Sequence, residues 1–600
     1  CFGEDRVILE DFFDCFSALE HFQNLPDHNS RAFESWSSSA NLSVCNDILI
    51  DLDSHETRDN DEVFKDFVLM QIDKAYELSS RGNEVYFLDE EGNKIRVESI
   101  VKEDYSGKIY DVDVGNDVIL VRRKNGTAMW SGNSNQGRTI YVDNLNAGDC
   151  LTYNVGTRTC GSGSEIKFDT IQEGANNVSA GDTVLVRGGS YVTSGEQSGQ
   201  AGIPTLWVNN IDGSPMQVTI FSNYGGEFVE LLGKNSGTTW YVLVVEDSDY
   251  VNISGLSVSR GLRTASIRNS QNVNIERVVF HNATGNGIRI EGTGSGSSDI
   301  VIKKSDFYDV PEGIMVGGGA GAIARNVLVE DNIFRGMGYQ FFDNGENGEA
   351  AYVRDDGNDT SNITFRGNVV HGTTGTGNGA ENGGNVVDYG RVIIENNIGF
   401  NTNVPLNTNG DGVPFKTKCD GLMNLHAIIR GNIAFNNSGG GFEFGTACRN
   451  QTAHNNVAYN NSRRFGGGGG YGFTSGNQNS VVVKNNVAYQ NALCDGCLGS
   501  SNVKTNNFFA EQVDNFPVVL GGDPMFNNPD AVINTTYLDD ININIDLRLQ
   551  YIRNKTKEMF IPLSGSELID NGVIISGYHC PTSGTTGSCV TWYGSAPDIG

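Results

Sequence analysis

A short β-rich unit recurs between residues 273 and 491, and it limits the possible fold more than any other feature of the sequence. Each unit has an alternating strand, a turn with Asn or Gly, a second strand and a Gly-rich break, as in VLVEDNIFRGM, VIIENNIGFNT and VVVKNNVAYQN. The units follow one another at about 24 to 36 residues. An alternating strand buries one face, which a single unit cannot do without a stacked neighbour. The repeat therefore predicts a solenoid, a single-stranded right-handed parallel β-helix.

Composition agrees with an all-β chain. The sequence holds 76 Gly among 600 residues and only 38% hydrophobic residues, which does not suit a helical or doubly wound protein. One Asn recurs at the same place in successive units, as at Asn397, Asn432, Asn456 and Asn486. Asn adopts turn conformations easily and stacks in ladders, so we expect these four residues to be structural.

Both ends of the region beyond residue 134 carry a family resemblance. GRTIYVDNLNAGD and FDTIQEGANNVSAGDTVLVRGGSY resemble the N-terminal cap and first coils of pectate-lyase-like β-helix proteins. LIDNG and APDIG, near the end, resemble the last coil of those proteins. The resemblance implies one β-helix domain over residues 134–600.

The junction Asn133-Ser134 has the residues that a self-excising protein needs. Cys1 can convert an upstream peptide bond to a thioester, Ser134 can take over the acyl group, and the Asn133 side chain can then cyclise and cleave the chain. Each step is nucleophilic catalysis made effectively unimolecular by the fold. The alternative is that Cys1 marks a truncated reading frame and that Asn133-Ser134 is an ordinary loop.

The segment before this junction resembles a small intein of the Hint fold, in its opening CFGEDRVIL and its closing YDVDVGNDVILVRRKNGTAMWSGNS. The resemblance implies a Hint-like β domain over residues 1–133, an upstream N-extein that is missing from this chain, and an assisting carboxylate at Asp111. Splicing would need no cofactor. The segment departs from the intein pattern at Gly132 and Asp117, where His is usual, and it has no Thr-x-x-His block between residues 60 and 100.

The cysteines are unevenly distributed. Three of the eleven lie before residue 134, which leaves 11 − 3 = 8 beyond it, in four local pairs: Cys150 with Cys160, Cys419 with Cys448, Cys494 with Cys497, and Cys580 with Cys589. Such pairs predict disulfides and an oxidising compartment. A metal or redox site at CDGC is the alternative, although no second CxxC accompanies it.

The net charge of −31 argues against a nucleic-acid surface, which needs clustered Lys and Arg. No apolar run is long enough to span a bilayer, and no signal peptide is present in this chain. We expect a monomer that is secreted or held at the cell surface after splicing. An acidic protein can still bind an acidic polymer where local cations or a metal reverse the field.

The segment from Asn401 to Gly421 contains NTNGDGVPFKTKCDG and is followed by HAIIRGNIAFNNSGGGFEF. It resembles the Lys-bearing coil of family nine polysaccharide lyases, which implies a base at Lys416, with Lys418 as the alternative. The resemblance also implies bound Ca²⁺, for which the candidate ligands are Glu381, Asp388 and Asp411. Ca²⁺ quenches the charge of a uronate carboxylate, so that the neighbouring C–H proton becomes acidic.

Four residues are candidates for binding the acidic polysaccharide. The side chains of Arg430, Arg463 and Arg464 could pair with its carboxylates, and Tyr459 could stack on a sugar ring. Solvated charges on an ordinary solenoid surface would give the same pattern. Three classes therefore remain open: a calcium-dependent lyase, a tailspike-type glycoside hydrolase with a carboxylate pair, and a noncatalytic adhesin.

Overall fold

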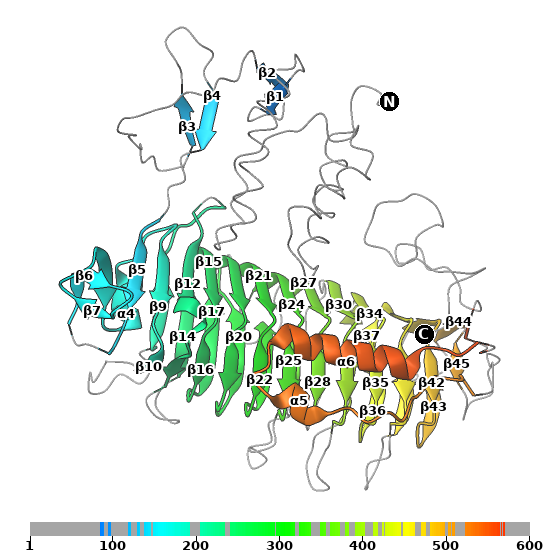
Figure 1. Ribbon diagram of the computed structural model, residues 1–600. Coiled ribbons are helices and arrows are strands. Elements are labelled where there is room, and N and C mark those ends of the chain that lie inside the picture. The colour runs from blue at the N-terminus through cyan, green and yellow to red at the C-terminus, as the bar shows by residue number, and fades with distance from the viewer. Residues whose placement is uncertain are drawn as a thin grey trace, which may run out of the picture. The chain divides into compact units, whose positions relative to one another are not determined.

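The computed structural model divides the chain into two compact units, Cys1–Asn135 and Gln136–Gly600. It describes four short strands between residues 85 and 132 and, with short internal gaps, residues 137–192, 204–233, 240–337, 349–402, 412–509 and 523–569. Figure 1 draws these residues in colour.

The described residues of the first unit form two antiparallel strand pairs. β1 (Val85–Leu88) pairs with β2 (Lys94–Val97), and β3 (Val118–Val121) pairs with β4 (Met129–Gly132). The residues predicted to carry out splicing lie outside the described residues: Cys1, Asp111, Asn133 and Ser134. A Hint-like fold over residues 1–133 therefore stays a prediction.

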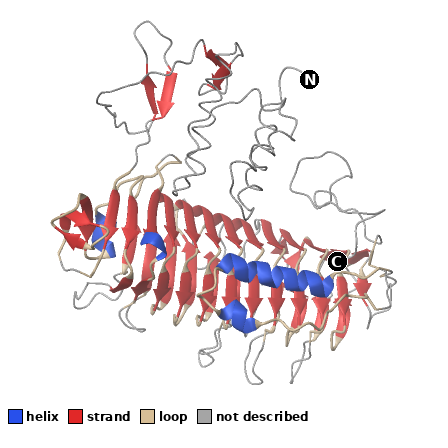
Figure 2. Cartoon of the chain, in the orientation of Figure 1, coloured by secondary structure: helices blue, strands red, loops and turns tan. Residues whose placement is uncertain are grey.

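The second unit is a solenoid of three sheets whose stacked coils pair in parallel, with antiparallel pairs only at the N-terminal edge of the 16-stranded sheet; this confirms the predicted parallel β-helix (Figures 1 and 2). Successive strands pass from the 16-stranded sheet to the 12-stranded sheet and then to the 11-stranded sheet, and the next strand begins a new coil. Equivalent positions stack from coil to coil, as in Ile275, Ile302 and Val329. This register keeps one face of every strand inside the solenoid.

The 16-stranded sheet contains, in chain order, β5 (Thr139–Val142), β6 (Cys150–Asn154), β7 (Thr159–Cys160), β8 (Glu165–Phe168), β9 (Thr183–Val186), β12 (Thr219–Asn223), β15 (Asp249–Ser254), β18 (Gln271–Glu276), β21 (Ser297–Lys303), β24 (Ala324–Glu330), β27 (Thr360–Arg366), β30 (Arg391–Glu395), β34 (His426–Arg430), β38 (Gln451–His454), β41 (Val481–Lys484) and β44 (Val503–Thr505).

The 12-stranded sheet contains β10 (Gly189–Val192), β13 (Val229–Leu232), β16 (Ser257–Ser259), β19 (Val279–His281), β22 (Asp306–Tyr308), β25 (Ile333–Arg335), β28 (Val369–His371), β31 (Ile398–Phe400), β35 (Ile433–Phe435), β39 (Val457–Tyr459), β42 (Val487–Tyr489) and β45 (Phe508–Phe509).

The 11-stranded sheet contains β11 (Leu206–Asn209), β14 (Tyr241–Glu246), β17 (Arg263–Arg268), β20 (Asn286–Glu291), β23 (Glu312–Gly317), β26 (Glu349–Asp355), β29 (Asn378–Asn382), β32 (Phe415–Thr417), β36 (Gly440–Phe444), β40 (Tyr471–Ser475) and β43 (Cys494–Leu498). β33 (Met423–Asn424) and β37 (Cys448–Arg449) form a separate parallel pair.

The interior is filled by stacked apolar side chains. Phe280, Phe307 and Phe334 stack with ring centroids 4.9 and 4.7 Å apart. This spacing follows the ≈ 4.8 Å separation of paired strands, so each coil adds one ring to the column. The solenoid core therefore depends on neighbouring coils and not on any single unit.

The predicted Asn ladder is present at one turn of the solenoid. The backbone N–H and side-chain amide of Asn397 both donate to Oδ1 of Asn432, at 2.9 and 3.0 Å, and Asn432 repeats this pattern onto Asn456. Asn486 continues the ladder. The left-handed conformation belongs to the preceding residue in each coil, as at Asn396.

The first coil is closed by α4 (Ile171–Asn176). Thr170 and Glu173 form a capping box, in which each side chain accepts a hydrogen bond from the backbone N–H of the other residue. Gly174 lies so close to the sheet that an added Cβ would meet the Val142 side chain at 2.8 Å. The helix thus packs directly on the first coil. A 3₁₀ turn, η1 (Tyr224–Gly226), follows β12.

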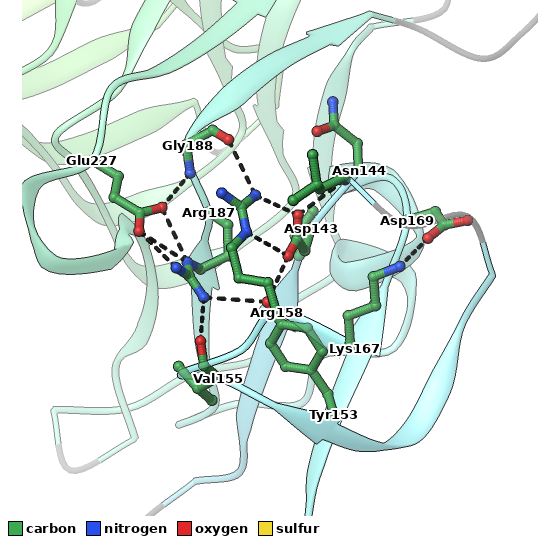
Figure 3. Close-up of polar contacts among 12 residues, drawn as sticks. Asp143, Asn144, Tyr153, Val155, Arg158, Lys167, Asp169, Arg187, Gly188 and Glu227 are labelled. Atoms are coloured by element: carbon green, nitrogen blue, oxygen red, sulfur yellow. Dashed lines mark hydrogen bonds and ion pairs between the residues drawn. The ribbon is translucent and has the colours of Figure 1, made fainter. Parts of the chain in front are cut away.

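Residues 143–176, which precede the regular coils, are called the N-terminal cap. A polar cluster connects this cap to the next coil (Figure 3). Arg158 donates to both oxygens of Asp143, at 2.9 and 2.5 Å, and the Tyr153 hydroxyl donates to the same carboxylate at 2.6 Å. Arg187 donates to the Tyr153 hydroxyl and pairs with Glu227 at 2.7 Å. Burial raises the pKa of Asp143, but these hydrogen bonds outweigh it and lower the pKa to about 2. The cluster therefore depends on an ionised Asp143.

The described residues after β45 do not continue the coils. They contain α5 (Thr535–Asp539), α6 (Ile545–Phe560) and no strand longer than an isolated bridge. Leu568 and Ile569 lie in a turn, and the rest of LIDNG and all of APDIG lie outside the described residues, so the expected last coil stays a prediction. The apolar face of α6 packs across the 12-stranded sheet (Figure 2). The residues of this contact are Ile333, Val369, Ile398, Phe400, Phe435, Leu538, Ile545, Leu549, Ile552, Met559 and Phe560.

Ion pairs fix the same segment to the coils. Arg548 and Asp306 pair at 2.8 Å, and both side chains are buried. Asp546 pairs with Arg277 at 2.9 Å and with Lys304 at 3.0 Å. The C-terminal segment therefore covers the outer face of the 12-stranded sheet. A functional site can then lie on the outer faces of the 11-stranded and 16-stranded sheets.

Two of the four predicted cysteine pairs are present as disulfides, Cys150–Cys160 and Cys494–Cys497. The side chains of the other two pairs lie outside the described residues. No described helix is long and apolar enough to cross a membrane.

Candidate functional site

Lys416 lies on the outer face of the 11-stranded sheet. In β32, Phe415 and Thr417 are buried and Lys416 between them is not, as alternation requires. Phe415 stacks on Phe442 and Phe442 on Phe473, with ring centroids 5.0 and 4.7 Å apart, so β32, β36 and β40 are aligned from inside. The outward residues of these three strands are thereby held in one row.

Glu443 of β36 is the register partner of Lys416. Lys416 Nζ lies 3.5 Å from Glu443 Oε1, and the Tyr471 hydroxyl donates to Glu443 Oε2 at 2.8 Å. Tyr471 reaches Glu443 because Gly440 has no side chain, since an added Cβ there would meet the Tyr471 ring at 2.3 Å. We call Lys416, Glu443 and Tyr471 the Lys416 cluster.

The Lys416 cluster combines an ammonium, a carboxylate and a phenol within hydrogen-bonding reach. The side chains of Lys416 and Glu443 are 15% and 27% exposed, so they are partly desolvated but still open to a ligand. Groups of these three types can accept or donate protons. The cluster is therefore a candidate site for proton transfer.

A second polar row lies on the same face, nearer the N-terminal coils. The Tyr352 hydroxyl donates to Glu312 Oε2 at 2.8 Å, and the Asn286 amide donates to the same oxygen. Arg263 Nε donates to Asn286 Oδ1 at 2.9 Å. Glu349 is the register partner of Glu312 and is buried. Two carboxylates thus stand on adjacent strands, whose spacing is about 4.8 Å.

Arg268 forms a third group at the same face. It lies over the Tyr241 ring, 4.3 Å from the centroid, and within 3.7 Å of Glu246 and 3.5 Å of Glu291. Trp207, which is 40% exposed, donates its indole N–H to Glu246 at 3.1 Å. This face therefore offers aromatic rings and charged groups along many coils.

Arg430 does not belong to this face. It lies on β34 in the 16-stranded sheet, where Glu276, Lys303, Glu330, Arg366, Glu395 and Arg430 form a ladder of alternating charge in register. Arg430 lies 2.5 Å from Glu395, and Arg366 lies 2.7 Å from it. Burial raises the pKa of Glu395, but hydrogen bonds from both arginines outweigh it and lower the pKa. Arg430 and Lys416 thus lie on different sheets, and the predicted substrate-binding role of Arg430 stays a prediction.

Tyr459 is covered by the C-terminal segment. Its ring is 1% exposed and makes edge contacts with Phe526 and Phe560, and its hydroxyl donates to Asp530 at 2.7 Å. The predicted sugar-stacking role of Tyr459 is therefore wrong, because its ring is buried beneath α6. The sequence shows the strand of Tyr459 but not the helix that packs on it.

Five predicted residues lie outside the described residues: Lys418, Asp388, Asp411, Arg463 and Arg464. Glu381 lies on β29, the strand that pairs with β32, but its side chain is not described. Among the described residues, no group of three or more His, Cys, Asp or Glu side chains could hold a metal ion. The calcium site therefore stays a prediction.

Three glutamates of this face were not predicted from sequence. Glu443 stands in GGFEF between two inward Phe residues, so alternation alone places it outward, but only the register shows that it meets Lys416. Glu312 and Glu349 come from different coils separated by 36 residues of intervening chain, and no local pattern pairs them. Such pairs can be recognised only when it is known which coil stacks on which.

Comparison with known proteins supports the fold. The family described as "Right handed beta helix region" matches residues 241–417, which lie within the solenoid and include Lys416. No curated protein matches this sequence significantly.

Three solved structures illustrate the similarity. The chain is 17% identical to pectate lyase Pel9A, with a TM-score of 0.42 and coverage of 77% of this chain and 96% of that one. The chain is 16% identical to the alginate lyase from Paenibacillus sp. str. FPU-7, with a TM-score of 0.33 and coverage of 56% of this chain and 94% of that one. It is 12% identical to the polygalacturonase from Erwinia carotovora ssp. carotovora, with a TM-score of 0.39 and coverage of 64% of this chain and 97% of that one. At these identities and TM-scores the similarity carries no argument about activity.

Proposed function

We propose that the β-helix unit is a carbohydrate-active enzyme, and specifically a polysaccharide lyase that cleaves acidic glycans by β-elimination. The Lys416 cluster carries the proposal, because it places a candidate base beside two further proton-exchanging groups on a partly exposed face. A polymer lying across the strands of this face would also meet the Arg268 group and Trp207.

In the proposed reaction the proton removed is the one next to the uronate carboxylate. Neutral Lys416 takes this proton, the C–H electron pair forms the new C=C bond, and the glycosidic C–O bond breaks with its electron pair going to oxygen. Tyr471 is placed to protonate that oxygen, because its hydroxyl lies in the same cluster. Lys418 remains the alternative base.

We also propose that Ca²⁺ assists this reaction. Hard oxygen ligands such as those of Glu381, Asp388 and Asp411 would hold the ion, which would quench the charge of the substrate carboxylate. The register supports only the position of Glu381, on the strand beside β32. Loss of activity in EDTA with recovery on added Ca²⁺ would test the requirement.

The experiment for the lyase is incubation with pectin, alginate and chondroitin, with and without Ca²⁺, while ultraviolet absorbance follows unsaturated uronate products. Lys416→Ala should abolish the signal. Lys484→Ala is the matched control, because Lys484 ends β41 on the 16-stranded sheet, away from the Lys416 cluster. Lys418→Ala decides between the two candidate bases.

A glycoside hydrolase is the second candidate, favoured by Glu312 and Glu349 on adjacent strands. Hydrolases of the retaining class place two carboxyl groups about 5 to 5.5 Å apart, close to the strand spacing. Hydrolysis would release reducing ends without ultraviolet absorbance and would be lost in Glu349→Gln. Glycan binding without new reducing ends would instead indicate an adhesin.

For the N-terminal unit we propose protein splicing by Cys1, Asn133 and Ser134, assisted by Asp111. It is supported by the sequence alone. Expression behind a short N-terminal tag, with mass spectrometry of the products, tests it, and Asn133→Ala is the control. A single intact species in both proteins would rule out activity. The disulfide Cys150–Cys160 supports the further proposal that the β-helix unit is secreted.

A further inference from the structure

The charged surroundings of Lys416 come from three strands. From β36, the Glu443 carboxylate lies 3.5 Å from Lys416 Nζ. From β40, the Tyr471 hydroxyl binds the other oxygen of Glu443 at 2.8 Å. On β29 the register partner is Gly379, which has no side chain, and Glu381 follows two residues later with its side chain outside the described residues. Glu443 thus places a carboxylate in contact with Lys416.

This contact conflicts with the protonation state that elimination requires. A carboxylate at 3.5 Å stabilises the ammonium form of lysine, because opposite charges attract and the pair is partly desolvated. A lysine that removes a carbon-bound proton must first be neutral. In the resting structure, Glu443 therefore favours the protonated form of Lys416, which cannot act as the base.

We propose that Glu443 is a positioning residue that sets the pH range in which Lys416 acts as the base. Its two carboxylate oxygens hold Lys416 and Tyr471 in one cluster, and its negative charge raises the pH at which Lys416 loses its proton. The proposal rests on the proposed lyase function for its catalytic meaning. The effect of Glu443 on the protonation of Lys416 can be measured without turnover.

The sign of the effect follows from charge. Removing the negative charge of Glu443 destabilises the ammonium form, so Lys416 loses its proton at lower pH. For a partly exposed pair at this distance the expected displacement is about one pH unit. Tyr471→Phe leaves the negative charge of Glu443 in place, so it should displace the titration less than Glu443→Gln does.

The test measures how fast Lys416 is acetylated by an amine-reactive ester as a function of pH, with peptide mass spectrometry of the full chain. Only the neutral amine reacts, so the midpoint reports Lys416 directly. Glu443→Gln should move the midpoint down by about one pH unit. Glu443→Asp and Tyr471→Phe should stay near the wild type, and Lys484 serves as a reference in the same digest. An unchanged midpoint in a folded Glu443→Gln protein overturns the proposal.

Turnover supplies the second readout. If the wild type is a lyase, the rising limb of its pH–rate profile should move to lower pH in Glu443→Gln by the same amount as the acetylation midpoint. A rate profile that does not move while acetylation does would refute the role of Lys416 as base. A wild type that is inactive on every glycan would refute the lyase function, whereas the acetylation result would still decide the role of Glu443.

Discussion

The Asn ladder makes a quantitative prediction at Asn432, whose side chain is fully buried. Its amide donates to Ile394 O at 2.9 Å and to Asn456 Oδ1 at 3.0 Å, and its Oδ1 accepts from the backbone and side chain of Asn397. Asn432→Ala removes four hydrogen bonds. It leaves the Ile394 carbonyl and two Asn397 N–H groups buried without these partners.

Each buried group left without its hydrogen bond costs about 1 to 3 kcal/mol, and relaxation or an entering water recovers part of that cost. We therefore expect Asn432→Ala to lower the free energy of unfolding by about 3 to 5 kcal/mol. Urea unfolding followed by circular dichroism measures the change. Asn252→Ala, at a half-buried outward position of β15, is the matched control and should stay within about 0.5 kcal/mol of wild type.

Equal unfolding midpoints for Asn432→Ala and Asn252→Ala would refute the reasoning, because the ladder would then contribute nothing beyond an ordinary polar surface. A large loss at both positions would also contradict it, since the effect would not be specific to the buried turn.

Three further predictions concern the cap, the C-terminal segment and the disulfide. The pKa of the Asp143 carboxyl is lowered from its ordinary value of 3.8 to about 2 in the folded protein, so ionised Asp143 stabilises the fold above pH 3.8 and this stabilisation is lost as the pH falls toward 2. In acid unfolding, the free energy of unfolding should therefore change by about 2 kcal/mol less with pH in Asp143→Asn than in wild type. Leu549→Ala should lower the free energy of unfolding by about 2 to 4 kcal/mol, because Leu549 packs between α6 and the 12-stranded sheet, whereas Leu547→Ala, at an exposed position of the same helix, should change it little in the same urea titration. Reduction of Cys150–Cys160, measured by thermal unfolding with and without reductant, should destabilise the cap, and no change would mean that the polar cluster of Figure 3 holds the cap alone.

Much of the solenoid could be predicted because its pattern is local. Alternation in VNIERVVF or VVVKNNVAY shows which side chains point inward, and the recurring Asn marks the turn in several successive coils. The same reasoning places Lys416 outward in FKT. These features need only the chain within one unit and the assumption that units stack.

What could not be predicted depends on contacts between distant parts of the chain. The α6 sequence IDLRLQYIRNKTKEMF has a weak apolar face, and nothing in it indicates that it packs on coils far earlier in the chain. That contact buries Tyr459. Lys416 and Arg430 are only 14 positions apart in sequence, yet their strands lie on different sheets. The Lys416–Glu443 pair likewise follows from the stacking of coils, which the repeat predicts only in general terms.

The most direct test of the central claim is the ultraviolet absorbance produced when the purified full chain is incubated with pectin, alginate and chondroitin in the presence of Ca²⁺. The account predicts that at least one acidic glycan gives unsaturated products, that Lys416→Ala abolishes the signal, and that Lys484→Ala retains it. No absorbance change on any of the three, or full activity in Lys416→Ala, would contradict the assignment of the Lys416 cluster as the active site of a polysaccharide lyase.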